Sequence, residues 1–257
     1  MQCSRIRSTL AIIIRMAGIR ERARVETTAE IVRLARLQVE QDGAASLSLR
    51  AIARSLGMVS SAVYRYFASR DELLTQLIVD SYERLGAAVE LADASVPVAD
   101  FRGRWRAAAN SFRDWAIENP SEYALLFDTP VPGYAAPQDT IGPASRYTAT
   151  LMGLLVDIES ATGVREGAVP LQLQHDFARL RAFFPAPASD VLMMYGMTSW
   201  AGMMGAITLE LFGHLRNVID TPGALFDALV DQYADLIIPQ PKPIHKAVKA
   251  SGRSRRK

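Results

Sequence analysis

Apolar residues recur every three to four positions along most of the chain, and this spacing predicts α-helices rather than β-strands. The first clear example runs from Arg24 to Gly43, and glycine is typical just past a helix end. No alternating apolar and polar stretch is long enough to predict a strand. We therefore expect an all-α fold, in which the apolar face of this first helix is formed by Ile31, Leu34, Ala35 and Val39.

Two short helical segments follow the first helix, and a glycine-containing break separates them. Residues 49–56 come after Ser48, whose hydroxyl is suited to cap free backbone amides. Residues 60–67 place Val63 and Phe67 on one side. A long helix followed by two short ones that meet at a glycine turn has the parts of a helix-turn-helix, in which the second short helix reads the DNA major groove.

The rest of the chain, to residue 238, also carries helical patterns. The first of these helices opens with a capping box, with Ser69 at the cap and Glu72 three residues later, and is expected to run to about Leu91. The segment 128–143 contains four prolines and is expected to be a loop. The other expected helices span 98–118, 120–127, 144–162, 171–183, 189–214 and 222–238.

These elements divide the chain into four parts. We expect residues 1–20 to be a disordered extension, or Met16 to be the working start, and residues 21–70 to form the helix-turn-helix domain. A long helix joins it to a helical ligand-binding and dimerisation domain, expected over residues 71–238. The basic, proline-bearing tail over residues 239–257 is expected to be disordered.

Charge is strongly segregated along the chain, although the net formal charge is only +2. Residues 1–70 carry twelve arginines and five acidic residues, and residues 241–257 carry seven basic residues and no acid. The body between these segments is therefore acidic. A basic N-terminal module beside an acidic body favours a polyanionic partner for that module, although a solvated charged surface without a partner has the same pattern.

The second short helix has the residue types that a DNA-reading helix needs. Val63 and Phe67 can anchor its apolar side, which leaves small and polar residues on the outer side for base edges. Tyr66 and Arg70 are expected where phosphates pass, and Arg50 projects from the first turn of the partner helix. A small helical subdomain that binds no nucleic acid also fits this pattern. The candidate DNA-binding residues are Ser48, Arg50, Ser60, Ser61, Ala62, Tyr64, Arg65, Tyr66 and Arg70.

Residues 31–74 closely resemble the DNA-binding domain of TetR-family repressors. The resemblance departs at Val59, because many members have a polar cap there; if Ser60 takes over the capping, the reading helix starts one residue later. The motifs that carry the resemblance are Leu-Ser-Leu-Arg-Ala-Ile-Ala at 47–53, Leu-Gly at 56–57, Tyr-Arg-Tyr-Phe at 64–67 and Ser-Arg-Asp-Glu-Leu-Leu at 69–74.

The resemblance implies a homodimer whose two reading helices enter successive major grooves of a palindromic operator. It also implies that a small ligand in the C-terminal domain spreads those helices and releases the DNA. We therefore expect a cytoplasmic transcriptional repressor, neither an enzyme nor a membrane protein. Its expected partners are double-stranded DNA, a small-molecule effector and a second copy of the chain.

Residues 101–214 resemble the tetracycline-repressor-like C-terminal subfamily called the WHG domain, chiefly over residues 115–127. The Trp-His-Gly triplet is Trp200-Ala201-Gly202 here, so alanine removes a polar group. The Met-, Gly- and aromatic-rich segment 192–212 suits an adaptable apolar pocket or plain core and dimer packing equally well. The helices expected over 189–214 and 222–238 are the candidates for a four-helix dimer interface. The candidate ligand-binding residues are Trp105, Phe112, Trp115, Phe127, Tyr147, Met193, Met197 and Trp200.

Little else in the sequence indicates catalysis or a cofactor. Glu210 and His214 have a metal-ligand spacing, but no second pair completes a site, so neither a metal nor another cofactor is expected. The single cysteine, Cys3, excludes an internal disulfide and fits a reducing cytoplasm. The rival hypothesis is a helical small-molecule-binding protein, or a helical-bundle enzyme, that uses the basic module only for assembly.

Overall fold

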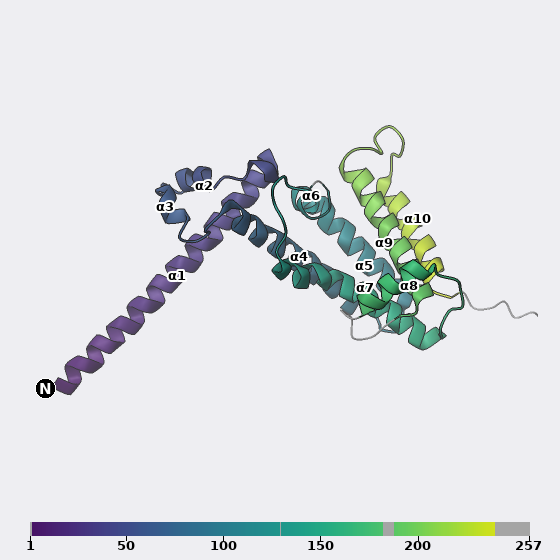
Figure 1. The fold of residues 1–257 in the computed structure, drawn as a ribbon, viewed down its shortest axis with the longest axis horizontal. Helices are drawn as coiled ribbons and strands as arrows, with labels where there is room; N and C mark the ends of the chain where they lie inside the picture. The colour runs from purple at the N-terminus through teal and green to yellow at the C-terminus, as the bar shows by residue number, and fades with distance from the viewer. Residues whose placement is uncertain (1, 129, 182–187, 240–257) are drawn as a thin grey trace, which may run out of the picture.

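The computed structural model describes residues 2–128, 130–181 and 188–239, and over these residues the chain is helical without any strand. The expected all-α fold is therefore confirmed. Figure 1 shows an elongated molecule, with α1 projecting from one end and α8, α9 and α10 gathered at the other. The helices are α1 (Gln2–Asp42), α2 (Leu49–Ser55), α3 (Ser60–Val63), α4 (Arg70–Ala94), α5 (Phe101–Glu118), α6 (Pro120–Phe127), α7 (Ile141–Thr162), α8 (Leu171–Arg181), α9 (Asp190–Leu211) and α10 (Pro222–Ile237), with 3-10 turns at Ala44–Ser46 and Gln138–Thr140.

Polar side chains cap several helices at the residues that the sequence predicts. The hydroxyl of Ser48 accepts the N–H of Ala51 (3.3 Å) at the start of α2, and that of Ser69 accepts the N–H of Glu72 (3.0 Å) at the start of α4. The Glu72 carboxylate accepts the N–H of Ala68 (2.6 Å), one residue before the usual partner in a capping box. Local hydrogen bonds therefore fix both ends of the short two-helix unit.

At its N-terminal end the chain differs from what the sequence predicted. Helix α1 continues to Gln2, so a helix stands where a disordered extension was expected over residues 1–20. Residues 2–42 contain no proline, and once a helix is nucleated each added residue contributes a further hydrogen bond. The expected disordered tail lies almost entirely outside the described residues, from 240 onward.

Two helices in the middle of the chain begin at other residues than the sequence predicted. Helix α5 begins at Phe101 rather than at residue 98, because the Asp100 carboxylate caps it by accepting the N–H of Gly103 (2.8 Å). Helix α7 begins at Ile141, inside the expected loop, and holds Pro143 in its first turn, where no intrahelical N–H bond is required.

The helices pack around two hydrophobic cores that share α4. The N-terminal core joins α1, α2 and α3 to the first half of α4, and the larger C-terminal core joins the second half of α4 to α5 through α10. The boundary between the cores thus lies within α4, and not at residue 70 where the domains were expected to divide. Each fully buried aliphatic side chain stabilises its core by about 1.5–3 kcal/mol, and on α4 these are Leu73, Leu74 and Leu77 in the first core and Leu85 and Val89 in the second.

Candidate nucleic-acid interface and effector cavity

Helix α3 presents a polar outer face because its apolar side is fixed in the N-terminal core. Val63 is fully buried and Phe67 nearly so, whereas Ser60, Ser61 and Tyr64 are exposed. The sharp turn before α3 depends on a glycine at position 57, whose φ of +65° is strained for other residues. The exposed hydroxyls are of the kind that hydrogen-bond base edges in a major groove.

Basic groups flank this face without being neutralised. Arg50, Arg54 and Arg65 are exposed, and none of them forms an ion pair within the described part of the chain. Ala62 and Tyr66 are half-buried, and the Tyr66 ring packs against the N-terminal core. Unpaired arginines beside a polar helix provide the positive charge that a phosphate backbone attracts.

Three observations in this region bear on the predicted DNA-binding residues. Val59 is the cap residue of α3 with no side-chain hydrogen bond, and α3 still starts at Ser60, so Ser60 does not take over the capping. The Arg70 guanidinium donates to the carbonyls of Ala44 (2.9 Å) and Ala45 (3.2 Å), so it holds the turn after α1. The Ser48 hydroxyl is occupied as the α2 cap.

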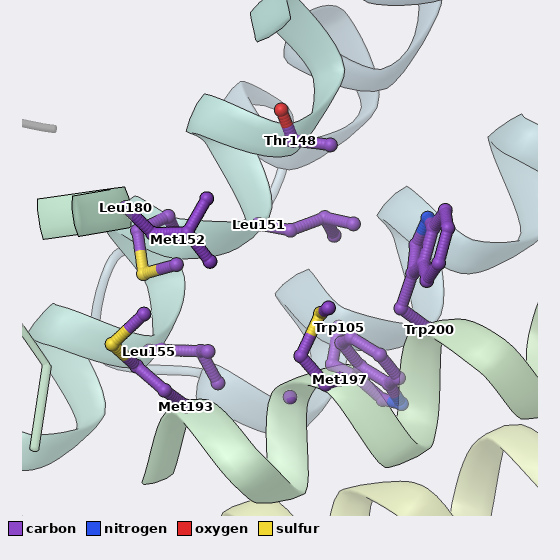
Figure 2. A pocket seen from close by; sticks show the side chains of 10 residues that line it. Trp105, Thr148, Leu151, Met152, Leu155, Leu180, Met193, Met197 and Trp200 are labelled. Atoms are coloured by element: carbon purple, nitrogen blue, oxygen red, sulfur yellow. The ribbon is translucent and has the colours of Figure 1, made fainter. Parts of the chain in front are cut away.

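The C-terminal domain contains an apolar space of about 240 Å³, here called the inner cavity. Figure 2 shows its walls: α7 on one side, α9 on the other, with Trp105 of α5 behind Met197. Four of the eight predicted ligand-binding residues line it. The full lining is Trp105, Thr148, Leu151, Met152, Leu155, Leu180, Met193, Gly196, Met197 and Trp200, so the α7 wall and Leu180 were not predicted.

The other four predicted residues do not line the inner cavity. Phe112, Trp115 and Tyr147 are buried in the C-terminal core, and Phe112 packs edge-on against Tyr147 with their centroids 5.4 Å apart. Burial raises the pKa of Tyr147, and the neighbouring Trp200 indole opposes the rise without forming a well-aligned hydrogen bond. These three side chains therefore form packing behind the cavity.

The fourth residue, Phe127, lines a larger and more open hollow of about 900 Å³ between α4, α6 and α7, here called the outer groove. Tyr82 of α4 and Ile78 one turn before it form part of the same wall. Thr148 and Leu180 line both the inner cavity and the outer groove. The two spaces are therefore neighbours that share a wall.

A polar network joins α1, α4 and α6 where the two cores meet. Arg36 of α1 donates to the Asp80 carboxylate (2.8 Å), and its Nε lies 3.9 Å from the Glu122 carboxylate of α6. Glu122 also accepts from the Ser81 hydroxyl (2.6 Å) and pairs with Arg84, both on α4. One carboxylate of α6 thus lies among side chains of both α1 and α4.

Helix α9 carries an apolar strip that is exposed in the described part of the chain. Met194, Leu209 and Phe212 are between 36% and 44% exposed, and the exposed small residues Ala201 and Gly205 lie between them on the same side. On another side of α9, Gly202 lies so close to Tyr233 of α10 that any Cβ would collide with the phenol ring. The pair α9–α10 is therefore tightly packed within the subunit and apolar outside it.

The Glu210–His214 spacing has a simpler explanation than a metal. Both carboxylate oxygens of Glu210 accept hydrogen bonds from Arg113 of α5, at 2.8 and 2.6 Å. The ion pair raises the pKa of Arg113 and ties α9 to α5. Over the described residues, no helix has the length and hydropathy needed to span a membrane.

Comparison with known proteins adds to this geometry. The family model described as bacterial regulatory proteins, tetR family, matches residues 31–77, and the model of the tetracyclin repressor-like C-terminal domain matches residues 105–233. The HTH-type transcriptional regulators Rv1816 of Mycobacterium tuberculosis (strain ATCC 25618 / H37Rv) and Mb1846 of Mycobacterium bovis are each 42% identical to the chain over 215 residues, which cover 82% of this chain and 92% of theirs.

The chain also superposes on solved structures of other proteins. The regulatory protein SCO4313 superposes with a TM-score of 0.69 at 32% identity, covering 83% of this chain and 97% of its own. The TetR-family regulator PfmR of Thermus thermophilus superposes with a TM-score of 0.54 at 18% identity, covering 82% and 99%, a likeness of fold alone.

Proposed function

Because the chain belongs to the TetR family of bacterial transcriptional regulators, we propose that it is a repressor that binds a palindromic operator as a homodimer. In this proposal a small, mostly apolar molecule enters the inner cavity and shifts the dimer to a state that leaves the DNA. The protein acts in the cytoplasm, where the operator lies.

The observation that carries the proposal is the two-sided character of α3. Val63 anchors its inner side, and Phe67, which lies four residues after α3 ends, is buried in the same core. Its outer side offers Ser60, Ser61 and Tyr64 at the molecular surface. An anchored helix with exposed polar groups and unpaired arginines beside it matches what direct readout of DNA requires.

The dimer is supported by the apolar strip on α9. A second copy that packs α9 and α10 against the same two helices would cover Met194, Leu209 and Phe212 with an identical surface. The small residues Ala201 and Gly205 lie on the exposed side of α9, and no atom lies within 4 Å of a Cβ at Gly205, so a second helix can approach closely.

The test is binding of the full-length protein to the DNA upstream of its own gene, measured by fluorescence anisotropy over a range of salt concentrations. If the dimer makes about six to ten phosphate contacts, affinity falls about a thousandfold or more between ~50 and ~200 mM salt. Ser61→Glu places a carboxylate against the base edges and phosphates, and we expect it to weaken binding at least about tenfold.

The matched control is Ser160→Glu, which makes the same change of charge at an exposed position near the end of α7. It should bind DNA like the unaltered protein. Equal losses in the two variants would assign the effect to net charge and remove α3 from the interface. An affinity that does not change with salt concentration would instead favour the rival function, in which the basic module serves assembly only.

A further inference from the structure

The inner cavity and the outer groove meet at two side chains. Thr148 and Leu180 contribute to the walls of both spaces. In Figure 2, Thr148 lies at the side of the inner cavity opposite the α9 residues Met193 and Met197. Thr148 and Leu180 therefore mark the place where a molecule longer than the inner cavity would reach the groove.

The lining of the inner cavity excludes a charged occupant. None of its side chains is ionisable, and the only side-chain hydroxyl among them, that of Thr148, already donates to the Ser145 carbonyl (2.9 Å). The charged group at its edge is Arg181, which reaches the Met193 sulfur (3.6 Å) but is paired with Asp190. An ion placed inside would lose its hydration without gaining a partner.

The two spaces differ in what they touch. Every residue around the inner cavity lies on α5, α7, α8 or α9. The outer groove is lined by Ile78, which belongs to the DNA-binding core, and by Tyr82, Leu126 and Tyr134, which pack against that core. Only an occupant of the groove therefore presses directly on side chains that support the helix-turn-helix.

We propose that the effector is an elongated, uncharged, mainly apolar molecule that lies through both spaces, and that its length decides whether it only binds or also releases DNA. This inference rests on the proposed function. A short molecule fills the inner cavity and leaves the DNA-binding core untouched. A longer one of the same chemistry passes Thr148, enters the groove and shifts the side chains of α4 and α6.

Linear primary alcohols from hexanol to dodecanol test both parts, with binding followed by the fluorescence of Trp105 and Trp200. Each methylene buried beyond the inner cavity adds about fourfold to affinity, so affinity should rise along the whole series. Dodecanoate, with a carboxylate in place of the hydroxyl group, should bind at least about tenfold more weakly than dodecanol. Dodecanol should lower operator occupancy at least about fivefold at saturation, and hexanol should not.

Thr148→Phe closes the passage, and Thr148→Val, of the same size as threonine, leaves it open. In the phenylalanine variant, affinity should stop rising at the shorter alcohols and dodecanol should no longer release DNA, whereas the valine variant should respond like the unaltered protein. Ser145→Trp, which fills the groove from the α7 side, provides the same block if Thr148→Phe does not fold. Release is expressed relative to each variant's own occupancy without alcohol.

The outcomes separate this inference from the proposed function. Failure to bind the upstream DNA in the absence of alcohol overturns the function itself. With DNA binding intact, the inference is overturned if hexanol at saturation releases DNA as well as dodecanol does, or if none of the alcohols binds. It is also overturned if dodecanoate binds as well as dodecanol, or if both blocked variants respond to dodecanol unchanged.

Discussion

Replacing Arg104 by methionine should destabilise the C-terminal domain more than any ordinary surface change. Arg104 of α5 is 7% exposed, and its guanidinium donates twice to Asp93 at the end of α4 (2.8 and 3.0 Å) and once to Asp157 of α7 (2.7 Å). Methionine keeps the apolar stem and removes the charge. The hydrogen bonds to Asp93 raise the pKa of Arg104, so the guanidinium is charged at every accessible pH.

The magnitude follows from how deeply each carboxylate is buried. Asp93 has only 16% of its side chain exposed, and removing one partner of such a buried pair costs about 3–5 kcal/mol. Asp157 is 45% exposed, so water replaces much of its lost contact and its share is at most about 1 kcal/mol. Because Asp93 can reach some water as well, we expect the free energy of unfolding to fall by about 3 kcal/mol.

Urea denaturation at fixed protein concentration measures this loss. Adding Asp93→Asn to Arg104→Met should recover part of it, because the uncompensated charge disappears. Arg106→Met is the matched control, since Arg106 is 49% exposed and pairs with the surface residue Asp231, and it should change stability little. A loss below about 1 kcal/mol for Arg104→Met, or strict additivity with Asp93→Asn, would refute this account of the network.

Three further changes test other parts of the structure. Gly202→Ala forces Tyr233 away from α9 and should lower the unfolding free energy by about 1–3 kcal/mol. Its control, Gly153→Ala, lies in open space on α7 and should raise the unfolding free energy by about 0.5–1 kcal/mol. Equal effects of the two changes in urea denaturation would contradict the close approach of α9 and α10. Leu209→Glu should dissociate the proposed dimer, as measured by light scattering, whereas Val164→Glu, which adds the same charge at another exposed apolar position, should not. If both variants remain dimeric, the dimer interface does not include Leu209. Burial raises the folded-state pKa of Tyr147, so its contribution to stability is complete below the unfolded-state tyrosine pKa of about 10 and is lost as pH rises above it. Tyr147→Phe should therefore flatten the fall of unfolding free energy above about pH 10, and unchanged slopes would count against the burial.

The DNA-binding half could be predicted closely because its signals are local. The caps Ser48 and Ser69 and the turn glycine at 57 act within a few residues of the boundaries that they set. The role of Arg70 could not be predicted in this way. Its partners, the carbonyls of Ala44 and Ala45, lie about one helix-turn-helix earlier in the chain. The sequence alone does not distinguish an arginine that binds phosphate from one that binds backbone carbonyls.

The cavity could be predicted only in part because periodicity does not distinguish a wall from a packed face. Leu151, Met152 and Leu155 on α7 follow the same apolar spacing as a helix that fills a core. Phe112 and Tyr147 have the composition of a pocket but pack against each other. The positions of Arg104 and Arg36 depend on partners from 11 to 86 residues away, which the folded arrangement of α1, α4, α6 and α7 alone brings together.

Helix α4 belongs to both cores and thereby couples the two halves of the molecule. Helices α4 and α6 link the C-terminal domain to the helix-turn-helix, because each carries a side chain that packs against both cores: Tyr82 of α4 and Leu126 of α6. The hydrophobic effect that holds the two cores together has no preferred direction of its own. The Glu122 carboxylate, held by Ser81 and Arg84 of α4 and facing Arg36 of α1, adds the directional contacts that packing lacks. A shift of α6 that left α1 in place would therefore separate Glu122 from Arg36 and disturb a partly buried ion cluster.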